Sequence, residues 1–206
     1  MPHGHSHNPG CGHEALGIEN ELEMGIQYSL YEKIDMNNLE CLNEESEGSG
    51  KTVFKSYIDR LNREKFVTSD ADEELLFNIP FTGNVKLKGI IIIGSEDDTH
   101  PKKMRLFKNR PKMTFDDAAV PADQEFELER DTHGVIEVVS FANVHHLSIH
   151  IPCNYGSDTT TVYYVGLKGE FSEAHHHGVT ICTYETRPNV SDHKNSLLDS
   201  VNHQIQ

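Results

Sequence analysis

The pattern of apolar and polar positions is clearest in the stretch 66–94. An acidic cluster, Asp70–Glu74, leads directly into the apolar run Leu75–Phe81, and after a break at Thr82–Asn84 the residues alternate and then become wholly apolar. Alternation with a period of two is typical of a half-buried strand, and a run of β-branched residues is typical of a strand covered on both faces. The pattern therefore predicts two core strands, Leu75–Phe81 and Val85–Gly94, joined at the break.

Further short apolar or alternating runs follow, separated by groups of Gly, Pro, Asn and Asp. About eight short strands without amphipathic helices between them favour an all-β sandwich or barrel. Before this region, the chain is expected to hold a helical turn around Tyr57. The strands are predicted at Leu75–Phe81, Val85–Gly94, Lys103–Lys108, Gln124–Glu129, Val135–Ser140, Val144–Ile151, Thr160–Lys168 and Val179–Tyr184.

The two ends of the chain differ from its middle. Residues 1–20 are rich in Gly, His and Asn without periodicity, and residues 187–206 are polar, so both are predicted to be flexible tails around one domain at 21–186. No stretch approaches the roughly 18 apolar residues of a membrane span, and the N-terminus lacks the pattern of a secretory signal. We therefore expect a soluble protein of the cytoplasm and nucleus that does not bind membranes.

The charge balance is strongly acidic, with 33 Asp and Glu against 18 Lys and Arg and a net charge of −15. This balance repels phosphates, so nucleic acid binding is not expected. The exception is the basic segment 101–112, which is interpreted as an edge strand guarded by lysines and as a candidate for docking an acidic protein surface. The basic residues predicted to bind a partner are Lys102, Lys103, Arg105, Lys108 and Arg110.

Histidine is abundant, with 14 residues, so metal binding has to be considered. His146 and His150 share one face of a predicted strand, but at about 3.3 Å per residue they stand about 13 Å apart, too far to ligate one zinc ion. The run His175, His176 and His177 lies in a predicted loop and joins the candidate partner-binding residues. No Cys or carboxylate set completes a closed site, so no metal or cofactor is predicted.

Catalytic motifs are missing from the sequence. There is no GxSxG or HExxH pattern, and the four cysteines include no CxxC, so redox chemistry is not expected. Gly48–Thr52 looks like the end of a phosphate-binding loop, but Glu45 stands where that motif needs Gly, so a flexible loop is predicted. A non-enzymatic protein is therefore expected, with acid–base catalysis by His146, His150 or the His175 loop as an open alternative.

Several of these segments together resemble the signature of the PITH domain family. The resemblance begins with Asp70–Phe81 and its continuation to Gly89, and it covers about residues 22–184. It implies a galactose-binding-domain-like β-sandwich of the jelly-roll type, which agrees with the strand count above. Further matching segments are Phe141, Asn143-Val144, His146–Ile149, Asp158–Thr160 and Tyr164–Glu170.

The family name abbreviates the C-terminal proteasome-interacting domain of a thioredoxin-like protein. The resemblance therefore implies a monomeric, non-enzymatic protein that docks on the 26S proteasome regulatory particle, although no contact residue can be transferred. The redox activity of thioredoxin-fused members is not carried over, since their CxxC is absent here. The alternative is a jelly roll that binds a small ligand or glycan, which fold analogy alone supports and which the lack of Trp disfavours. Whether Asp70–Glu74 caps the sheet or faces a partner is left open.

Overall fold

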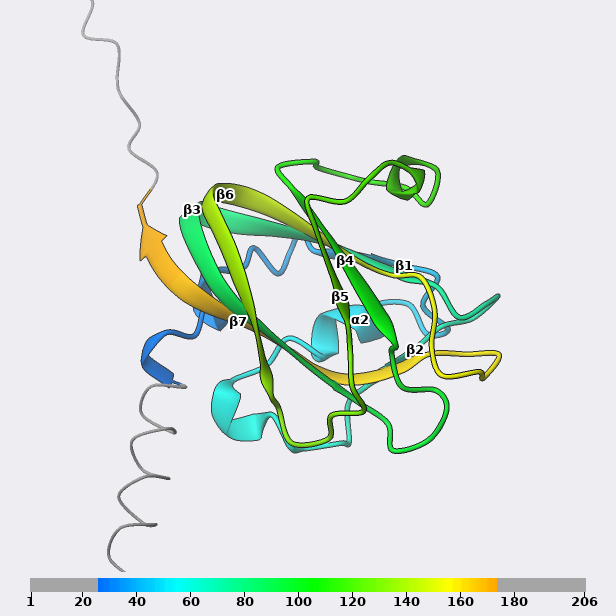
Figure 1. Cartoon of the computed structure of the whole chain (residues 1–206). Coiled ribbons are helices and arrows are strands. Elements are labelled where there is room, and N and C mark those ends of the chain that lie inside the picture. Colours follow the sequence, from blue (N-terminus) through cyan, green and yellow to red (C-terminus); the bar gives the residue numbers. More distant parts are fainter. Residues whose placement is uncertain (1–25, 174–206) are drawn as a thin grey trace, which may run out of the picture. The chain divides into compact units, whose positions relative to one another are not determined.

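The computed structural model describes residues 26–173 and consists mainly of antiparallel strands (Figure 1). No helix among these residues is long and apolar enough to cross a membrane. The elements in chain order are η1 (Tyr31–Lys33), β1 (Glu40–Leu42), α2 (Ser49–Thr52), η2 (Tyr57–Asp59), β2 (Val67–Thr68), β3 (Leu75–Gly94), β4 (Lys103–Lys108), η3 (Asp117–Ala119), β5 (Gln124–Glu127), β6 (Ile136–Ile151) and β7 (Thr161–Ser172).

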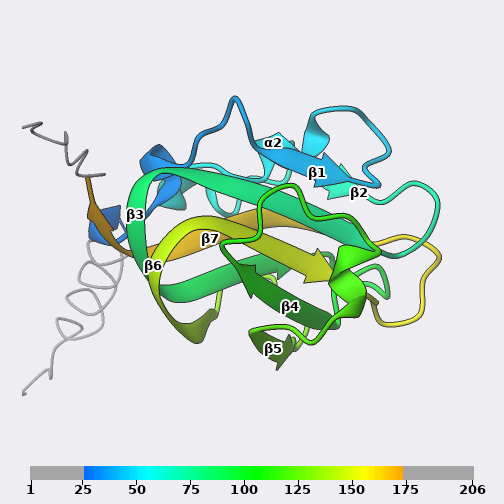
Figure 2. The ribbon, with the colours of Figure 1, turned by 90° about the horizontal axis from the view of Figure 1, so that it is seen from above.

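Two long strands, β3 and β6, organise the sandwich because each runs through both of its layers (Figures 1 and 2). The first half of β3 pairs with β1 and with the second half of β6, which in turn pairs with β4 and through it with β5. The second half of β3 lies between the first half of β6 and β7, and β7 also pairs with β2. The described chain is therefore a β-sandwich jelly roll, as predicted.

The core lies between the two layers and takes side chains from both. Phe77 and Ile79 from the first half of β3 belong to the same buried cluster as Ile90 and Ile92 from its second half. Phe54, from the segment before β2, packs its ring edge-on against Phe77, with the centroids 5.8 Å apart. Such a cluster of β-branched and aromatic side chains supplies the main driving force for closing the sandwich.

The predicted break at Thr82–Asn84 is not a turn, so the prediction of two separate strands there is wrong. β3 is one strand of 20 residues that bends while its pairing register shifts between Pro80 and Val85. Gly83 lies in the bend because a Cβ there would come within 2.7 Å of the Phe171 ring. The glycine thus allows close packing of a curved strand, which is a common role of Gly in sheets.

The same correction applies to the predicted strands Val135–Ser140 and Val144–Ile151, which are the two halves of β6. The bend is at Asn143, whose φ of 57° is left-handed, and the Asn84 side chain from the bend of β3 donates to Asn143 Oδ1 at 3.2 Å. Asparagine adopts this conformation more readily than other non-glycine residues. Bends in the neighbouring strands therefore coincide, which carries both strands from one layer to the other.

Of three further predictions about secondary structure, one is confirmed and two are wrong. The helical turn at Tyr57 is confirmed as η2, but Gly48–Thr52 contains the short helix α2 instead of a loop. The interpretation of Lys103–Lys108 as an edge strand is wrong, since β4 lies between β5 and β6. The predicted strand Val179–Tyr184 lies outside the described residues.

Candidate docking site

The basic residues of β4 face an acidic partner inside the same sheet. β4 pairs with β5 so that Arg105 lies opposite Glu125. One Glu125 oxygen is 2.8 Å from Lys103 Nζ, and the other accepts from Arg105 Nε at 2.9 Å. The hydrogen bonds from Lys103 and then Arg105 lower the pKa of Glu125. Two of the five predicted docking cations are therefore already paired within the ribbon of β4 and β5.

Arg105 also holds the segment that follows β4. Its side chain is only 15% exposed, and its two terminal nitrogens donate to the carbonyls of Ala118 and Val120 at 2.6 and 2.8 Å. These carbonyls lie at and just after η3, where the chain turns back toward β5. Arginine suits this position because its planar fork can satisfy several acceptors at once. We therefore assign Arg105 a structural role in the fold.

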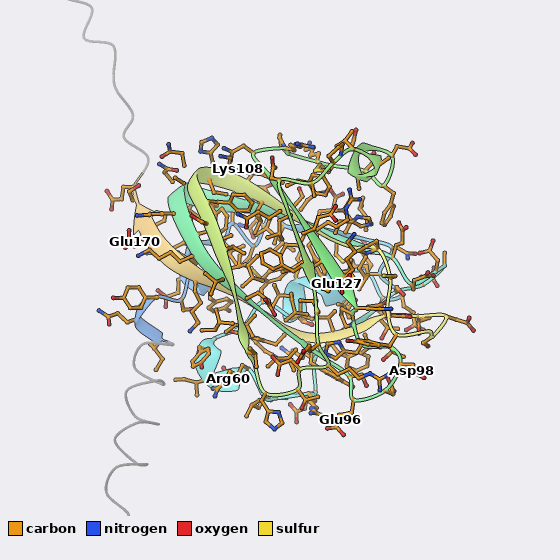
Figure 3. All side chains as sticks on the ribbon, viewed as in Figure 1. Arg60, Glu96, Asp98, Lys108, Glu127 and Glu170 are labelled. Atoms are coloured by element: carbon orange, nitrogen blue, oxygen red, sulfur yellow. The ribbon has the colours of Figure 1, made fainter. Side chains whose placement is uncertain are left out.

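The remaining predicted cations differ in whether they have a carboxylate partner. Arg110 lies 3.7 Å from Asp123. Lys102 and Lys108 form no ion pair with a described carboxylate; their Nζ atoms lie 5.9 Å from the Tyr155 ring centroid and 6.0 Å from that of Phe141. Lys108 lies near the bend of β6 (Figure 3). Lys102, just before β4, and Lys108, at its end, are thus the cations without a described carboxylate partner, while His175, His176 and His177 lie outside the described residues.

The segment between β4 and β5 covers one face of β3 and β6 through a buried polar network. Asn78 of β3 donates to the Met113 carbonyl at 2.9 Å and accepts from the Met113 amide at 3.1 Å. Its Oδ1 also accepts from the Ser148 hydroxyl at 2.9 Å. Leu76, Phe107 and Met113 form a small apolar cluster on this face. Because buried polar groups are costly unless bonded, Asn78 fixes where the segment rests.

The two histidines considered for metal binding occupy different surroundings on this face. His150 is 4% exposed, lies edge-on to Phe115 at 6.1 Å and has Nε2 3.4 Å from a Glu74 oxygen. Burial lowers the pKa of His150, and the nearby Glu74 only partly offsets that effect. Burial also lowers the pKa of His146. No group of His, Cys, Asp and Glu within residues 26–173 has an arrangement that could hold a metal ion.

The acidic cluster Asp70–Glu74 is a turn held by Asn43. The Asn43 amide nitrogen donates to Asp72 Oδ1 and to the Glu74 carbonyl, both at 2.7 Å, and its oxygen accepts from the Ala71 amide at 3.0 Å. Thr160 donates to the Glu73 carbonyl as well. The cluster therefore sets the entry into β3, which gives it a structural role.

The segment that looked like a phosphate-binding loop is bound by a carboxylate of the same chain. Glu44 accepts from the amides of Gly48 and Gly50 at 2.5 and 2.6 Å, and from the Ser49 hydroxyl at 3.3 Å. The amide groups that would face a phosphate are thus occupied. Next to this segment, a groove of about 720 Å³ lies along β1 and reaches His146. Its charged lining is mixed in sign: Glu40, Glu44, Glu47, Lys51 and Lys112.

Comparison with known proteins decides the family. The PITH domain family matches residues 20–188. The chain belongs to the PITH domain family. PITH domain-containing protein GA19395 of Drosophila pseudoobscura pseudoobscura is 66% identical over 100% of both chains. PITH domain-containing protein 1 of Homo sapiens is 56% identical over 94% of each chain, and the Dictyostelium discoideum protein of the same name is 37% identical over 89% of this chain and 93% of its own.

Solved structures share the fold at low sequence identity. The CBM32-1 and CBM32-2 domains of Clostridium perfringens ZmpB, in complex with GalNAc, match with a TM-score of 0.56 at 10% identity, over 75% of this chain and 40% of that one. The same domains together with the M60 catalytic domain of ZmpB also match with 0.56, at 11% identity over 76% and 16%. The fold of this PITH domain is therefore a galactose-binding-like jelly roll.

Proposed function

We propose that this PITH protein is a non-enzymatic, monomeric docking factor of the cytoplasm and nucleus that binds the 26S proteasome regulatory particle. The observation that carries the proposal is membership of the PITH domain family over residues 20–188, since the family name denotes proteasome interaction. The absence of recognisable catalytic motifs supports the non-enzymatic part. Burial also raises the pKa of the Cys41 thiol, which makes this cysteine a poor nucleophile.

Docking by this protein uses exposed cations, because its net charge of −15 otherwise favours repulsion from acidic surfaces. Lys102, just before β4, and Lys108, at its end, are not engaged by a described carboxylate, whereas Lys103 and Arg105 share Glu125. Such peripheral charges act mainly on the association rate and on its salt dependence. The basic contribution to docking is therefore assigned to Lys102 and Lys108 within the predicted patch.

The direct test mixes the purified full-length protein with purified 26S proteasome at low ionic strength and separates the complexes on a native gel. The proposal is supported if the protein co-migrates with the proteasome and if added free regulatory particle removes this co-migration by competition. An absence of co-migration at micromolar concentrations, with the protein shown to be folded, contradicts the proposal. If the isolated 20S core particle competes and the free regulatory particle does not, the proposal is also contradicted.

Glycan binding is the second candidate, since the ZmpB domains of like fold were solved with GalNAc. Fold alone does not carry a ligand from one protein to another. The chain has no Trp for stacking on a sugar ring, and the groove along β1 is lined by charges of both signs. A glycan array with no signal from the full-length protein removes this candidate, and a specific hit together with no co-migration with the proteasome favours it over docking.

A further inference from the structure

Within residues 26–173, the first half of β6 has a neighbouring strand on one side only. β3 pairs with β6 on one side along most of its length, but on the other side β4 pairs only with Leu147–His150. The Asn109 side chain bonds to the Asn143 carbonyl and to the amides of His145 and His146, which closes the edge at the bend. Among residues 26–173, no bond reaches the outer edge of 136–142 from another segment.

This open edge is also apolar. Val138 is 78% exposed, Val135 is 64% exposed and Ile136 is 46% exposed. Val138 pairs with Gly89, and the space over that glycine is taken by the Ile136 side chain, since a Cβ there would come within 2.7 Å of Ile136 Cγ2. An exposed edge strand with apolar side chains invites pairing with another strand, and soluble proteins usually blunt such edges with lysine, proline or a bulge. None of the residues from Ile136 to Ala142 is a lysine or a proline.

The surroundings of the edge determine which kind of strand fits. Lys108 lies near Phe141 at the bend, and Arg60 lies near Gly134 at the other end (Figure 3). On the neighbouring β3, the exposed Lys86 and Lys88 both pair with the single carboxylate of Glu170 on β7. The Asp131 carboxylate accepts hydrogen bonds from the backbone amides of residues 133–135. On the edge strand itself, Glu137 is the one carboxylate.

We propose that the open edge of β6, residues 136–142, binds an extended acidic peptide segment of a partner protein by strand addition. The backbone of that segment completes the hydrogen bonds left open on β6, which gives affinity with little dependence on sequence. Apolar residues at alternate positions of the segment lie against Ile136 and Val138. Acidic residues at its ends meet Lys108 and Arg60, an attraction that stands out in a chain with a net charge of −15.

The probe is a synthetic peptide of sequence Asp-Glu-Val-Thr-Val-Thr-Val-Glu-Asp with blocked ends, titrated into full-length protein and followed by amide NMR shifts. We expect shifts concentrated at residues 136–142 and their pairs on β3. A peptide with lysine in place of its acidic residues should bind more weakly at low salt, and one with a central proline should lose binding. The assay needs no proteasome, so its outcome is distinct from that of the proposed function.

The matched variants are Val138→Lys and Val120→Lys, because Val120 is also exposed, at 43%, but lies after η3 and away from this edge. Val138→Lys should weaken peptide binding about tenfold, equivalent to about 1.4 kcal/mol, while Val120→Lys leaves it unchanged. Val138→Thr, which keeps the β-branch without the charge, should retain most of the binding, and an unchanged amide spectrum of Val138→Lys away from the edge shows that its loss is not due to unfolding.

Three results overturn the inference. The first is an absence of shifts at 136–142, or equal affinity of Val138→Lys and the unchanged protein. The second is sedimentation of the free protein as a dimer that Val138→Lys dissociates, which assigns the edge to a second copy. The third is slow exchange of all amides from 137 to 141 in the free full-length protein, which means that the edge is already covered within the chain.

Discussion

The two halves of β6 have similar apolar content but opposite surroundings. From Val144 to Ile151 the strand pairs with β3 and in part with β4, and Ile149 is fully buried. From Ile136 to Ala142 it pairs with β3 alone, and Val138 is 78% exposed. The difference arises because β4 and β5 continue only the second half into a wider sheet. One strand thus contributes core at one end and a binding edge at the other.

The paired half also carries the polar side chains that the fold has to satisfy. Ser148 and His150 of this half, together with Asn78 opposite Ser148 on β3, lie beneath the segment between β4 and β5, bonded or close to groups of that segment and of Glu74. The open half carries no comparable buried polar group. Substitutions in the paired half should therefore act on stability, and substitutions in the open half should act on binding.

Asn78→Ala should have the largest effect on stability. It removes three hydrogen bonds and leaves the Met113 amide and the Met113 carbonyl without their partner, while the Ser148 hydroxyl keeps the Arg110 carbonyl at 3.2 Å. We expect a loss of about 2–3 kcal/mol in the free energy of unfolding, since each buried polar group left unsatisfied costs about 1–3 kcal/mol. Urea denaturation measures it. Ser140→Ala, in the open half, is the control and should stay within about 0.5 kcal/mol of the unchanged protein. Equal losses would erase the contrast between the halves.

Arg105→Met should come next. The methionine keeps the aliphatic packing but loses the bonds to Glu125, Ala118 and Val120. A loss of about 1–2 kcal/mol is expected, because the bonds are charge-assisted and the side chain is largely buried. Lys102→Met serves as the control, with little change expected for an exposed lysine. If both variants unfold at the same urea concentration, Arg105 does not anchor the segment after β4.

The stability of the paired half should depend on pH through His150. Burial holds the pKa of His150 below its usual 6.5, with Glu74 acting in the opposite direction and Arg105 in the same direction. His150 binds a proton more readily in the unfolded chain than in the folded one. Its contribution to the free energy of unfolding is therefore complete above pH 6.5 and is lost as the pH falls through the folded pKa. Thermal unfolding of His150→Gln from pH 7 to 5 should show a flatter dependence. His145→Gln, at an exposed position, should keep the original slope.

The double change Lys102→Glu and Lys108→Glu should have the smallest effect, and only on association. Proteasome binding should weaken a few-fold at about 50 mM salt and be nearly unchanged at about 300 mM, because exposed charges are screened within about a Debye length. Native-gel titration at both ionic strengths measures this. Lys65→Glu, an exposed lysine after η2, is the control. An equal effect of the double change at both salt concentrations would point to damaged folding.

The sequence was enough to predict the family, the all-β fold and most strand positions, because alternation and β-branched runs report burial directly. It could not show that Gly83 and Asn143 mark bends within continuous strands, since the same residues also make turns. The basic residues of β4 were visible, but Glu125 pairs with Lys103 and Arg105 only through the register of β5. The open edge of β6 was hidden for the same reason: Val138 is a typical strand residue, and only the topology of residues 26–173 leaves it paired on one side alone.

Hydrogen exchange along the full-length chain, measured alone and with 26S proteasome, tests the central claim most directly. The account predicts slow exchange at residues 147–150 in both samples. With the proteasome as the partner that supplies the acidic segment, it predicts fast exchange at the outward amides of 136–142 in the free protein and slow exchange in the complex. Protection that appears elsewhere but not at 136–142 would retain docking and reject the β6 edge as its site. Unchanged exchange along the whole chain in the presence of proteasome would contradict docking itself.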